Sequence, residues 1–274
     1  MSNLAGYGGF ARSGLKDRME VATFWDDFFS GYALENSNFV SATVDQARWA
    51  MNGDTGSAIT NSDTAPGGIA VLYSDGTSAD RTELILNGEQ FYLSKGKKLY
   101  FVCRVAGDDI SDMNLFVGLT QTSTAVLDSR FIHETAGSAT DLDRVGFFFG
   151  DNTGAGGTQA ANIIAVCAKA TNCIAIDTGE DVADATLATF NTTSRIYAFE
   201  WDGVDTLRFF LADAGDGPQE LKEVLVLKEG QVIDALTVAI PTALPLVPIV
   251  GIKVDDDAAA RSTWLDYVGV AMER

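Results

Sequence analysis

The segment from Ser194 to Asp213, which reads SRIYAFEWDGVDTLRFFLAD, most constrains the fold of this chain. Two apolar, aromatic-rich runs, Arg195–Trp201 and Thr206–Leu211, flank the dipeptide Asp202-Gly203. Glycine accepts the positive φ angles that reverse a chain between antiparallel strands, so the segment predicts a β-hairpin. Aromatic side chains at every second position share one face of a strand, which we expect to lie in a hydrophobic core. The residues expected on this core face are Tyr197, Phe199 and Trp201.

Strand-like runs with turn-rich separators fill most of the remaining chain, and no helical period competes over a comparable length. The run Leu99–Val105 is apolar on both faces, which is typical of a central strand in a two-layer structure. A short helix or irregular connection is expected only at Val182–Phe190. The fold class is therefore all-β, a two-sheet antiparallel β-sandwich with a short irregular N-terminal arm.

The expected strands share β-branched or aromatic composition and turn residues at their ends. They are Phe24–Phe29, Arg48–Asn52, Gly68–Ser74, Thr82–Leu86, Phe91–Leu93, Leu99–Val105, Leu115–Thr120, Val145–Phe149, Ile163–Ala168, Cys173–Ile176, Leu221–Leu227, Ile249–Val254 and Trp264–Ala271.

Each tryptophan has apolar neighbours in the sequence, so we expect the tryptophans in the core rather than on a surface that stacks against sugars. The further residues expected in the core are Leu99, Phe101, Phe209, Trp25, Trp49 and Trp264.

The first 22 residues differ in character from the rest of the chain. Four glycines break any period there, and three basic residues against two acidic ones give a net charge of +1. The whole chain carries −19, so residues 23–274 carry −20. We predict an arm at residues 1–22 that docks on a partner and a β-sandwich at residues 23–274. A merely frayed terminus is the alternative for the arm. The expected partner-binding residues are Phe10, Arg12, Leu15, Lys16 and Arg18.

The composition, with 38 acidic and 19 basic residues, argues against several partner classes. A strongly acidic surface repels phosphate backbones and anionic lipid headgroups, so we expect neither nucleic acid nor membrane as a partner. The N-terminal residues lack the apolar core of a secretory signal, and no run of 18 apolar residues is present. We therefore expect synthesis in the cytoplasm without secretion.

The residues that most often carry chemistry are few. Of three cysteines, Cys167 and Cys173 could face each other across a hairpin and form a bridge, although cytosolic synthesis disfavours disulfides. His133 is the only histidine, and neither a zinc-ligand spacing nor a serine nucleophile motif accompanies it. We interpret it as a loop histidine without a chemical role.

Three segments resemble the concanavalin A-like and laminin-G-like jelly rolls. They are the strand Lys97–Val105 followed by Asn114-Leu115-Phe116-Val117-Gly118-Leu119, the hairpin at Ser194–Asp213, and the closing Trp264-Leu265-Asp266-Tyr267-Val268-Gly269-Val270. The acidic body and glycine-rich arm are also similar in style to virion proteins of tailed bacteriophages. This resemblance implies a structural virion protein, a capsid decoration or cement protein that forms homo-oligomers and binds the major capsid protein or another virion protein. A tail or fibre component, or a carbohydrate-binding adhesion module that holds a glycan, is the alternative.

Glu200, Asp202 and Asp205 approximate the E-x-D-x-x-E array with which jelly-roll glycoside hydrolases of the laminarinase type place two carboxylates on one strand face. The match fails at two points, because the third residue is Asp rather than Glu and because Asp202-Gly203 predicts a turn. We therefore expect no enzymatic activity and no catalytic residues.

Two acidic loops are the weak candidates for a metal site. Concanavalin A-like domains often hold calcium at the rim of a sheet, and Ca²⁺ takes six to eight oxygen ligands. Neither loop has EF-hand spacing, so no cofactor is expected, and a bound Ca²⁺ is the alternative. The candidate ligands are Asp151, Asp255, Asp256 and Asp257.

Overall fold

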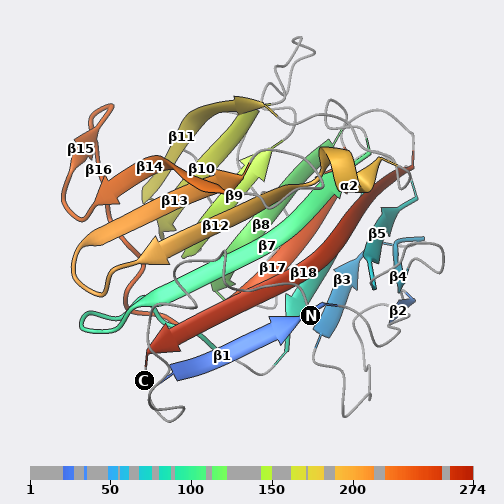
Figure 1. Ribbon diagram of the computed structural model, residues 1–274, viewed down its shortest axis with the longest axis horizontal. Coiled ribbons are helices and arrows are strands. Elements are labelled where there is room, and N and C mark those ends of the chain that lie inside the picture. Colours follow the sequence, from blue (N-terminus) through green and yellow to red (C-terminus); the bar gives the residue numbers. More distant parts are fainter. Residues whose placement is uncertain are drawn as a thin grey trace.

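Two antiparallel sheets lie face to face in the computed structural model of this chain (Figure 1). The structure describes residues 21–27, 34–35, 49–54, 56–61, 68–75, 80–87, 90–108, 113–121, 143–149, 162–170, 172–181, 189–212, 220–254 and 260–273. Within these ranges the regular structure is strand apart from one short helix, which confirms the predicted all-β sandwich.

The first sheet, sheet A, contains nine of the described strands. Eight follow the order β14-β13-β12-β7-β18-β5-β4-β2. The long strand β18 pairs with β5 through its first half and with β1 through its second half, while β7 pairs along its length. The strands are β1 (Val21–Asp26), β2 (Leu34–Glu35), β4 (Ala58–Asn61), β5 (Ala70–Ser74), β7 (Leu99–Gly107), β12 (Arg195–Trp201), β13 (Thr206–Ala212), β14 (Leu221–Lys228) and β18 (Arg261–Glu273).

The second sheet, sheet B, contains seven described strands in the order β11-β10-β9-β8-β17-β6-β3. A small hairpin of β15 (Val232–Ile233) and β16 (Leu236–Thr237) pairs separately. The strands of sheet B are β3 (Trp49–Gly53), β6 (Arg81–Leu86), β8 (Met113–Gln121), β9 (Arg144–Phe149), β10 (Asn162–Lys169), β11 (Asn172–Asp181) and β17 (Leu246–Val254).

Two expected elements differ from the structure. The short helix α2 (Phe190–Thr193) begins where the expected segment Val182–Phe190 ends, and residues 182–188 lie outside the described ranges. The expected strand Phe91–Leu93 is only an isolated bridge between Phe91 and Leu246. None of the described helical structure is long and apolar enough to cross a membrane.

The predicted hairpin is confirmed as β12 and β13, which pair from Tyr197 with Leu211 to Trp201 with Leu207. Gly203 in the turn has a φ of +81°, and a Cβ at this position would lie 2.9 Å from backbone atoms of Lys97. The turn thus requires glycine both for its backbone angle and for its close approach to the neighbouring connection. The indole N–H of Trp201 donates to the Ser94 carbonyl at 2.9 Å, which fastens the hairpin to the same connection.

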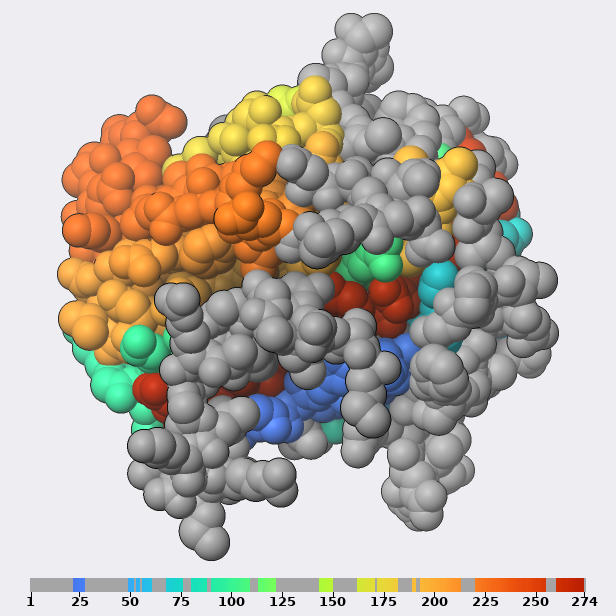
Figure 2. Space-filling view, in the orientation of Figure 1, coloured from blue at the N-terminus to red at the C-terminus, as the bar shows by residue number. Residues whose placement is uncertain are grey.

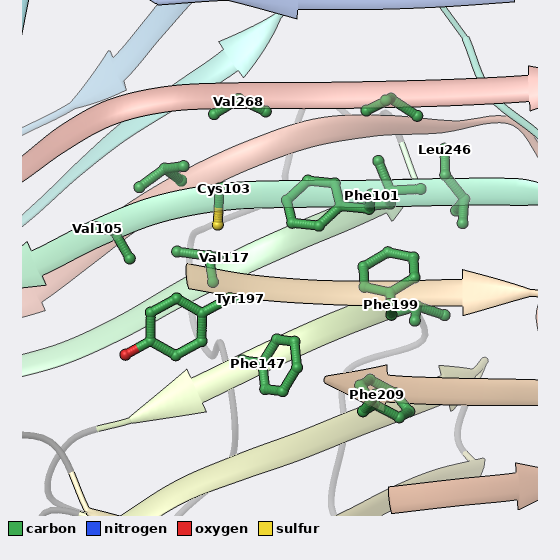
Figure 3. Close-up of a cluster of buried hydrophobic side chains, with 14 of the residues drawn as sticks. Phe101, Cys103, Val105, Val117, Phe147, Tyr197, Phe199, Phe209, Leu246 and Val268 are labelled. Atoms are coloured by element: carbon green, nitrogen blue, oxygen red, sulfur yellow. The ribbon is translucent and has the colours of Figure 1, made fainter. Parts of the chain in front are cut away.

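Aromatic rings from both sheets meet in the core (Figure 3). Within sheet A, Phe101 and Phe199 stack with ring centroids 4.9 Å apart. Across the sandwich, Phe147 of sheet B meets Tyr197 at 5.4 Å and Phe209 at 5.3 Å, both edge to face. Such pairs stabilise a core beyond the area that they bury. The residues predicted to be buried here are so in the structure: Leu99, Phe101, Tyr197, Phe199, Trp201 and Phe209.

The possible bridge between Cys167 and Cys173 is wrong, since both thiols are free. The two cysteines do lie on the paired strands β10 and β11, but Cys167 is opposite Ile174 and Cys173 is opposite Ala168. Side chains at adjacent register positions point to opposite faces of a sheet. Cys167 therefore lies in the core between the sheets and Cys173 lies on the outer face of sheet B.

Strand β1 joins the start of the chain to both sheets. Val21 and Ala22, expected in the arm, are its first two residues, so the predicted boundary at residue 22 falls inside this strand. Six residue pairs connect β1 to β18 within sheet A. Across the sandwich, Phe24 packs edge to face on Trp49 of β3 at 5.5 Å, and the Trp49 indole donates to Asp26 Oδ2 at 2.8 Å. Because both Asp26 and Trp49 are buried, this hydrogen bond fixes the edge of one sheet to the edge of the other.

We expect Trp49→Phe to lower the free energy of unfolding by about 1–3 kcal/mol, because the buried Asp26 carboxylate loses a donor. Urea unfolding monitored by circular dichroism measures the change. Asp26→Asn is the control, since it keeps an acceptor oxygen facing the indole and should cost less. Equal stability of Trp49→Phe and the wild type would contradict a stabilising role for this hydrogen bond.

Candidate functional site

The carboxylate array suggested by the sequence does not assemble on one strand. Glu200 lies on the outer face of sheet A, opposite Tyr100 of β7 and Arg208 of β13. Asp202 and Asp205 lie beyond the end of β12, in the turn that leads to β13. The predicted interruption of the array by a turn is confirmed.

Asp202 organises that turn instead of facing a substrate. Its Oδ1 atom accepts hydrogen bonds from the backbone N–H groups of Val204 at 2.7 Å, Asp205 at 3.1 Å and Thr206 at 3.0 Å. Burial tends to raise the pKa of Asp202, but these donors outweigh it and hold the pKa below its ordinary value. The Asp202 carboxylate is therefore ionised at neutral pH, and its Oδ1 atom is occupied by the backbone donors of its own turn.

A pair of stacked aromatic rings marks a different part of the outer face of sheet A. Trp25 of β1 stacks on Tyr267 of β18, with centroids 4.9 Å apart and planes 21° apart. A Cβ on Gly269, the register partner of Trp25, would lie 2.5 Å from the Trp25 ring, so glycine here lets the indole lie against β18. Trp25 is 38% exposed. Its expected place in the core is wrong, whereas Trp49, Trp201 and Trp264 are buried as predicted.

Charged groups lie next to this aromatic pair. The register of β18 against β7 shifts at Asp266, so an extra residue is accommodated between Leu265 and Tyr267. Such a bulge re-aims side chains, and here Leu265 remains in the core while Asp266 forms a 3.1 Å ion pair with Arg104. The Arg104 guanidinium also lies over the Phe190 ring of α2, 5.1 Å from its centroid.

The charge of the Asp27 carboxylate influences the pKa of Asp266. Burial raises the pKa of Asp266, Arg104 opposes that rise, and Asp27, which follows β1, adds to it. The net direction is upward. Asp27 itself is exposed. The region beside the Trp25 and Tyr267 rings thus carries two carboxylates and one guanidinium.

A second polar row crosses the same face further along β7 and β12. The Tyr100 hydroxyl is hydrogen-bonded to Glu200, and burial together with the Glu200 charge raises the pKa of Tyr100 to about 12. Tyr100 therefore stays protonated at neutral pH and remains a donor. Arg208 lies 3.7 Å from Glu223 of β14 at the far end of this row.

Between the aromatic pair and the polar row the face carries short side chains. Pairing places Gly269 beside Val102 and Ala271 beside Tyr100, and Ala198 lies on the other side of Val102. Figure 2 looks onto this face, where the blue atoms of β1 lie beside the red atoms of β18 and the orange atoms of β13 and β14 lie beyond β7. We call this side of sheet A the Trp25 face. Trp25 and Asp27 are exposed there, whereas Tyr267, Gly269 and the short side chains between them and the polar row are buried. Its members are Trp25, Asp27, Tyr100, Arg104, Glu200, Asp266, Tyr267 and Gly269.

Known proteins resemble this chain in fold but not in sequence. No protein-family model matches the sequence, and no curated protein matches it. A protein of unknown function from Shewanella oneidensis MR-1 matches with a TM-score of 0.53 and 10% identity, over 93% of this chain and 87% of that one. Peanut lectin matches with a TM-score of 0.52 and 11% identity, over 92% and 97% of the two chains. An endo-1,3-beta-glucanase from Streptomyces sioyaensis gives 0.53 and 13%, over 92% and 96%.

The fold is a concanavalin A-like sandwich. This confirms the predicted architecture over most of the chain. Because the identities are so low, the likeness extends to the fold alone, which lectins and glucanases share. The similarity to virion proteins of tailed phages stays a prediction.

The residues singled out from the sequence for partner or metal binding lie outside the described ranges. Among the residues that the structure describes, no three His, Cys, Asp or Glu side chains come together as a metal site. The residues outside the ranges are Phe10, Arg12, Leu15, Lys16, Arg18, His133, Asp151, Asp255, Asp256 and Asp257.

Sequence reasoning missed the Trp25 face because its members come from β1, β7, β12 and β18, which are far apart in the sequence. The closing segment Trp264–Ala271 was predicted as a strand, but nothing in it signals the bulge at Asp266. Gly269 was the one available signal, since a glycine inside a strand often marks a close approach by another group.

We expect Asp202→Ala to lower the free energy of unfolding by about 1 kcal/mol at neutral pH, because three backbone donors lose their acceptor. A carboxylate with a depressed folded pKa contributes stability above its unfolded pKa of about 3.9 and loses it as the pH falls through the folded value. The gap between wild type and Asp202→Ala should therefore narrow in acid, as urea unfolding at several pH values can measure. Asp202→Asn, which keeps an acceptor without charge, should be less destabilised at neutral pH, and its gap to the wild type should also narrow in acid because only the wild-type side chain ionises. A gap for Asp202→Ala that is the same at neutral pH and in strong acid would contradict this account.

Proposed function

We propose that this protein is a non-enzymatic structural component of a tailed-phage particle, where it decorates the capsid and binds the major capsid protein or another virion protein through its arm. The observation that carries the proposal is the attachment of β1, the strand that follows the predicted arm, to both sheets. β1 is hydrogen-bonded along β18 in sheet A and is joined to β3 of sheet B through Asp26 and Trp49. A pull on the arm is therefore distributed over both sheets of a rigid sandwich.

The charge distribution also supports attachment through the arm rather than through the body. Residues 23–274 carry −20, so the body repels an acidic neighbour within a Debye length of about 8 Å at physiological salt. Arg12, Lys16 and Arg18 offer attraction in the arm. Phe10 and Leu15 would add apolar contacts of about 1.5–3 kcal/mol each when fully buried.

The absence of catalysis is proposed from the geometry of the carboxylates. Retaining glycosidases need two carboxyl groups about 5–5.5 Å apart, one acting as nucleophile and the other as acid. Glu200 is bonded to Tyr100, and Asp202 is occupied by three backbone donors of its own turn. Neither carboxylate is arranged as a partner for the other.

A carbohydrate-binding module is the second candidate, and the exposure of Trp25 favours it. Exposed aromatic rings bind the apolar faces of pyranose rings, and the flanking charged and hydroxyl groups would bind sugar hydroxyls. Two of the structural relatives are named as peanut lectin and an endo-1,3-beta-glucanase.

The particle test uses a phage that encodes this protein. Purified particles should contain it in many copies by quantitative mass spectrometry. Deleting residues 2–20 should leave a folded protein, because β1 stays intact, yet the truncated protein should no longer bind particles that lack it. Undiminished binding of the truncated protein would show that attachment lies in the body, and absence of the protein from purified particles would refute the virion assignment.

Titration with laminarin oligosaccharides and cellotetraose separates the structural proposal from its alternatives. We expect neither binding at millimolar concentration nor release of reducing sugar. Binding that Trp25→Ala abolishes would favour the carbohydrate-binding module. Release of reducing sugar that Glu200→Ala abolishes would identify an enzyme.

A further inference from the structure

We propose that one end of the sandwich binds the acidic body of a second copy of this chain, in a contact that repeats head to tail. Lysine side chains and a projecting apolar hairpin lie together at this end, which we call the lysine end. The contact uses the body rather than the arm, so it goes beyond the proposed function. The members of the lysine end are Lys95, Lys97, Lys98, Lys169, Lys228, Val204, Val232 and Leu236.

Two connections of sheet A meet at the lysine end, on the left of Figure 1. The connection at residues 94–98, which leads into β7 and carries three of the lysines, contacts the β12–β13 turn, where the Gly96 N–H donates to the Gly203 carbonyl. β14 ends beside the same turn, because Lys228 is the register partner of Thr206. Four of the five lysines therefore lie around one turn.

The fifth lysine and the small β15–β16 hairpin lie next to these connections. The hairpin follows β14 directly, and its base is closed by the Gly230 N–H, which donates to the Val238 carbonyl at 2.9 Å. Asn172, the register partner of Lys169 at the β10–β11 turn, donates through Nδ2 to the Thr237 carbonyl at 2.7 Å. The hairpin is thus held at its base, while its tip projects at the left of Figure 1.

Exposed apolar side chains add to the lysine end. Val232 of β15 is 66% exposed, Leu236 of β16 is 40% exposed, and Val204 in the β12–β13 turn is 64% exposed. These three are half of the six large apolar side chains that are exposed in the described part of the chain. Apolar side chains gathered on a projecting surface gain free energy when a partner covers them, so they favour a contact here.

The lysines offer positive charge that the arginines of the body do not. Residues 23–274 contain seven lysines, and five of them lie at the lysine end. None of these five forms an ion pair with another residue that the structure describes. Arg81, Arg104, Arg195 and Arg208, by contrast, are each paired with a carboxylate. The positive charge that is open to a partner is therefore concentrated at one end.

Carboxylates also lie at this end, and they favour a protein as the partner. Asp205 Oδ1 accepts a hydrogen bond from the Thr206 hydroxyl at 2.7 Å, and Glu229 Oε2 accepts one from the Ile240 N–H at 2.6 Å. Asp234 is exposed at the tip of the hairpin. A lipid surface or a phosphate backbone is uniformly negative and would meet these carboxylates as well as the lysines. A folded protein can match a mixed pattern of charges.

The acidic body of a second copy supplies such a surface. Residues 23–274 carry −20 although most of their lysines lie at one end, so the rest of a neighbouring body is strongly acidic. Two lysine ends placed together would bring ammonium groups opposite each other, which is unfavourable. The contact therefore joins two different surfaces, the lysine end of one copy and the acidic body of the next. Contacts of this kind build a ring or an open chain.

Sedimentation velocity on the full-length protein measures the contact. The wild type should associate beyond a dimer as its concentration rises at low ionic strength, and salt should weaken the association because exposed charges are screened. The triple variant Lys95→Glu, Lys97→Glu, Lys98→Glu should raise the dissociation constant about tenfold, as expected when several exposed charge pairs are lost. Circular dichroism should show the wild-type fold, because none of these side chains is buried.

Lys253→Glu is the matched control for Lys98→Glu, because both variants change the net charge by the same amount. Lys253 is the register partner of Asn114 at the start of β8, at the opposite end of the sandwich from Lys98. Lys98→Glu should weaken the association several-fold, whereas Lys253→Glu should leave it unchanged. Equal effects would show that only the total charge matters and would overturn the proposal.

Replacing the exposed side chains of the hairpin tests the apolar part of the contact. The double variant Val232→Ser, Leu236→Ser should raise the dissociation constant about tenfold, because less apolar area is buried on association. Tyr73→Ser is the control, since Tyr73 is 38% exposed on β5, outside the lysine end, and should leave the association unchanged.

A mixing experiment tests whether the contact joins two different surfaces. The triple lysine variant keeps its acidic body, so a labelled sample of it should bind unlabelled wild-type protein with the wild-type dissociation constant. The same labelled sample should bind the unlabelled triple variant about tenfold more weakly. A contact between two like ends would instead give the mixed pair an intermediate dissociation constant.

Other results would also overturn the inference. A monomer at every concentration and ionic strength would do so, and so would an association that the triple lysine variant leaves unchanged. Loss of association on deleting residues 2–20 would place the contact in the arm. A monomeric protein that binds vesicles containing phosphatidylserine through the same lysines would assign this end to a lipid surface.

Discussion

The pairing of β18 with three other strands is the constraint on which the rest of this structure depends. Its residues form ladders with β7 on one side and with β5 and β1 on the other, so it holds together most of sheet A. Alternation along the strand sends Val268 and Val270 into the core and leaves Tyr267 and Gly269 on the outer face. The shift in register at Asp266 adds a carboxylate to that outer face without removing Leu265 from the core. One strand therefore supplies both the stability of the sandwich and the centre of its candidate binding surface.

The parts of the fold that the sequence predicts are those governed by short-range pattern. The β12–β13 hairpin follows from alternating aromatics around Asp202-Gly203, and its core face is as expected. Where two consecutive residues are both apolar, the alternation does not predict which of them faces the core. Phe24 and Trp25 are both aromatic, so composition cannot say which one faces inward, and the inward position belongs to Phe24 because it meets Trp49 across the sandwich. The two cysteines show the same ambiguity. A change of one residue in the register of β10 against β11 would place Cys167 and Cys173 opposite each other, but the observed register places them on opposite faces of sheet B.

The candidate site was less accessible to prediction because it exists only after the sheet has formed. Trp25, Tyr100, Glu200 and Tyr267 belong to four strands whose order in the sheet is not their order in the sequence. The same architecture occurs in a lectin and in a glucanase, so the fold constrains this choice of side chains very little. The carboxylates of this chain differ in their surroundings. Asp202 in the turn accepts hydrogen bonds from three backbone N–H groups, Asp266 is ion-paired with Arg104, and Asp27 beside Trp25 is exposed.

The pairing of the first strand with the last has a consequence for the timing of synthesis. β1 leaves the ribosome before every other strand described, yet its partner β18 is the final one to emerge. Contacts so distant in sequence form slowly, and β1 cannot form its ladder until β18 has been made. The segment in front of β1 is therefore joined to a completed sheet A only after β18 has left the ribosome. If that segment binds a partner, as proposed, chains that stop before β18 would lack the rigid body that transmits the attachment.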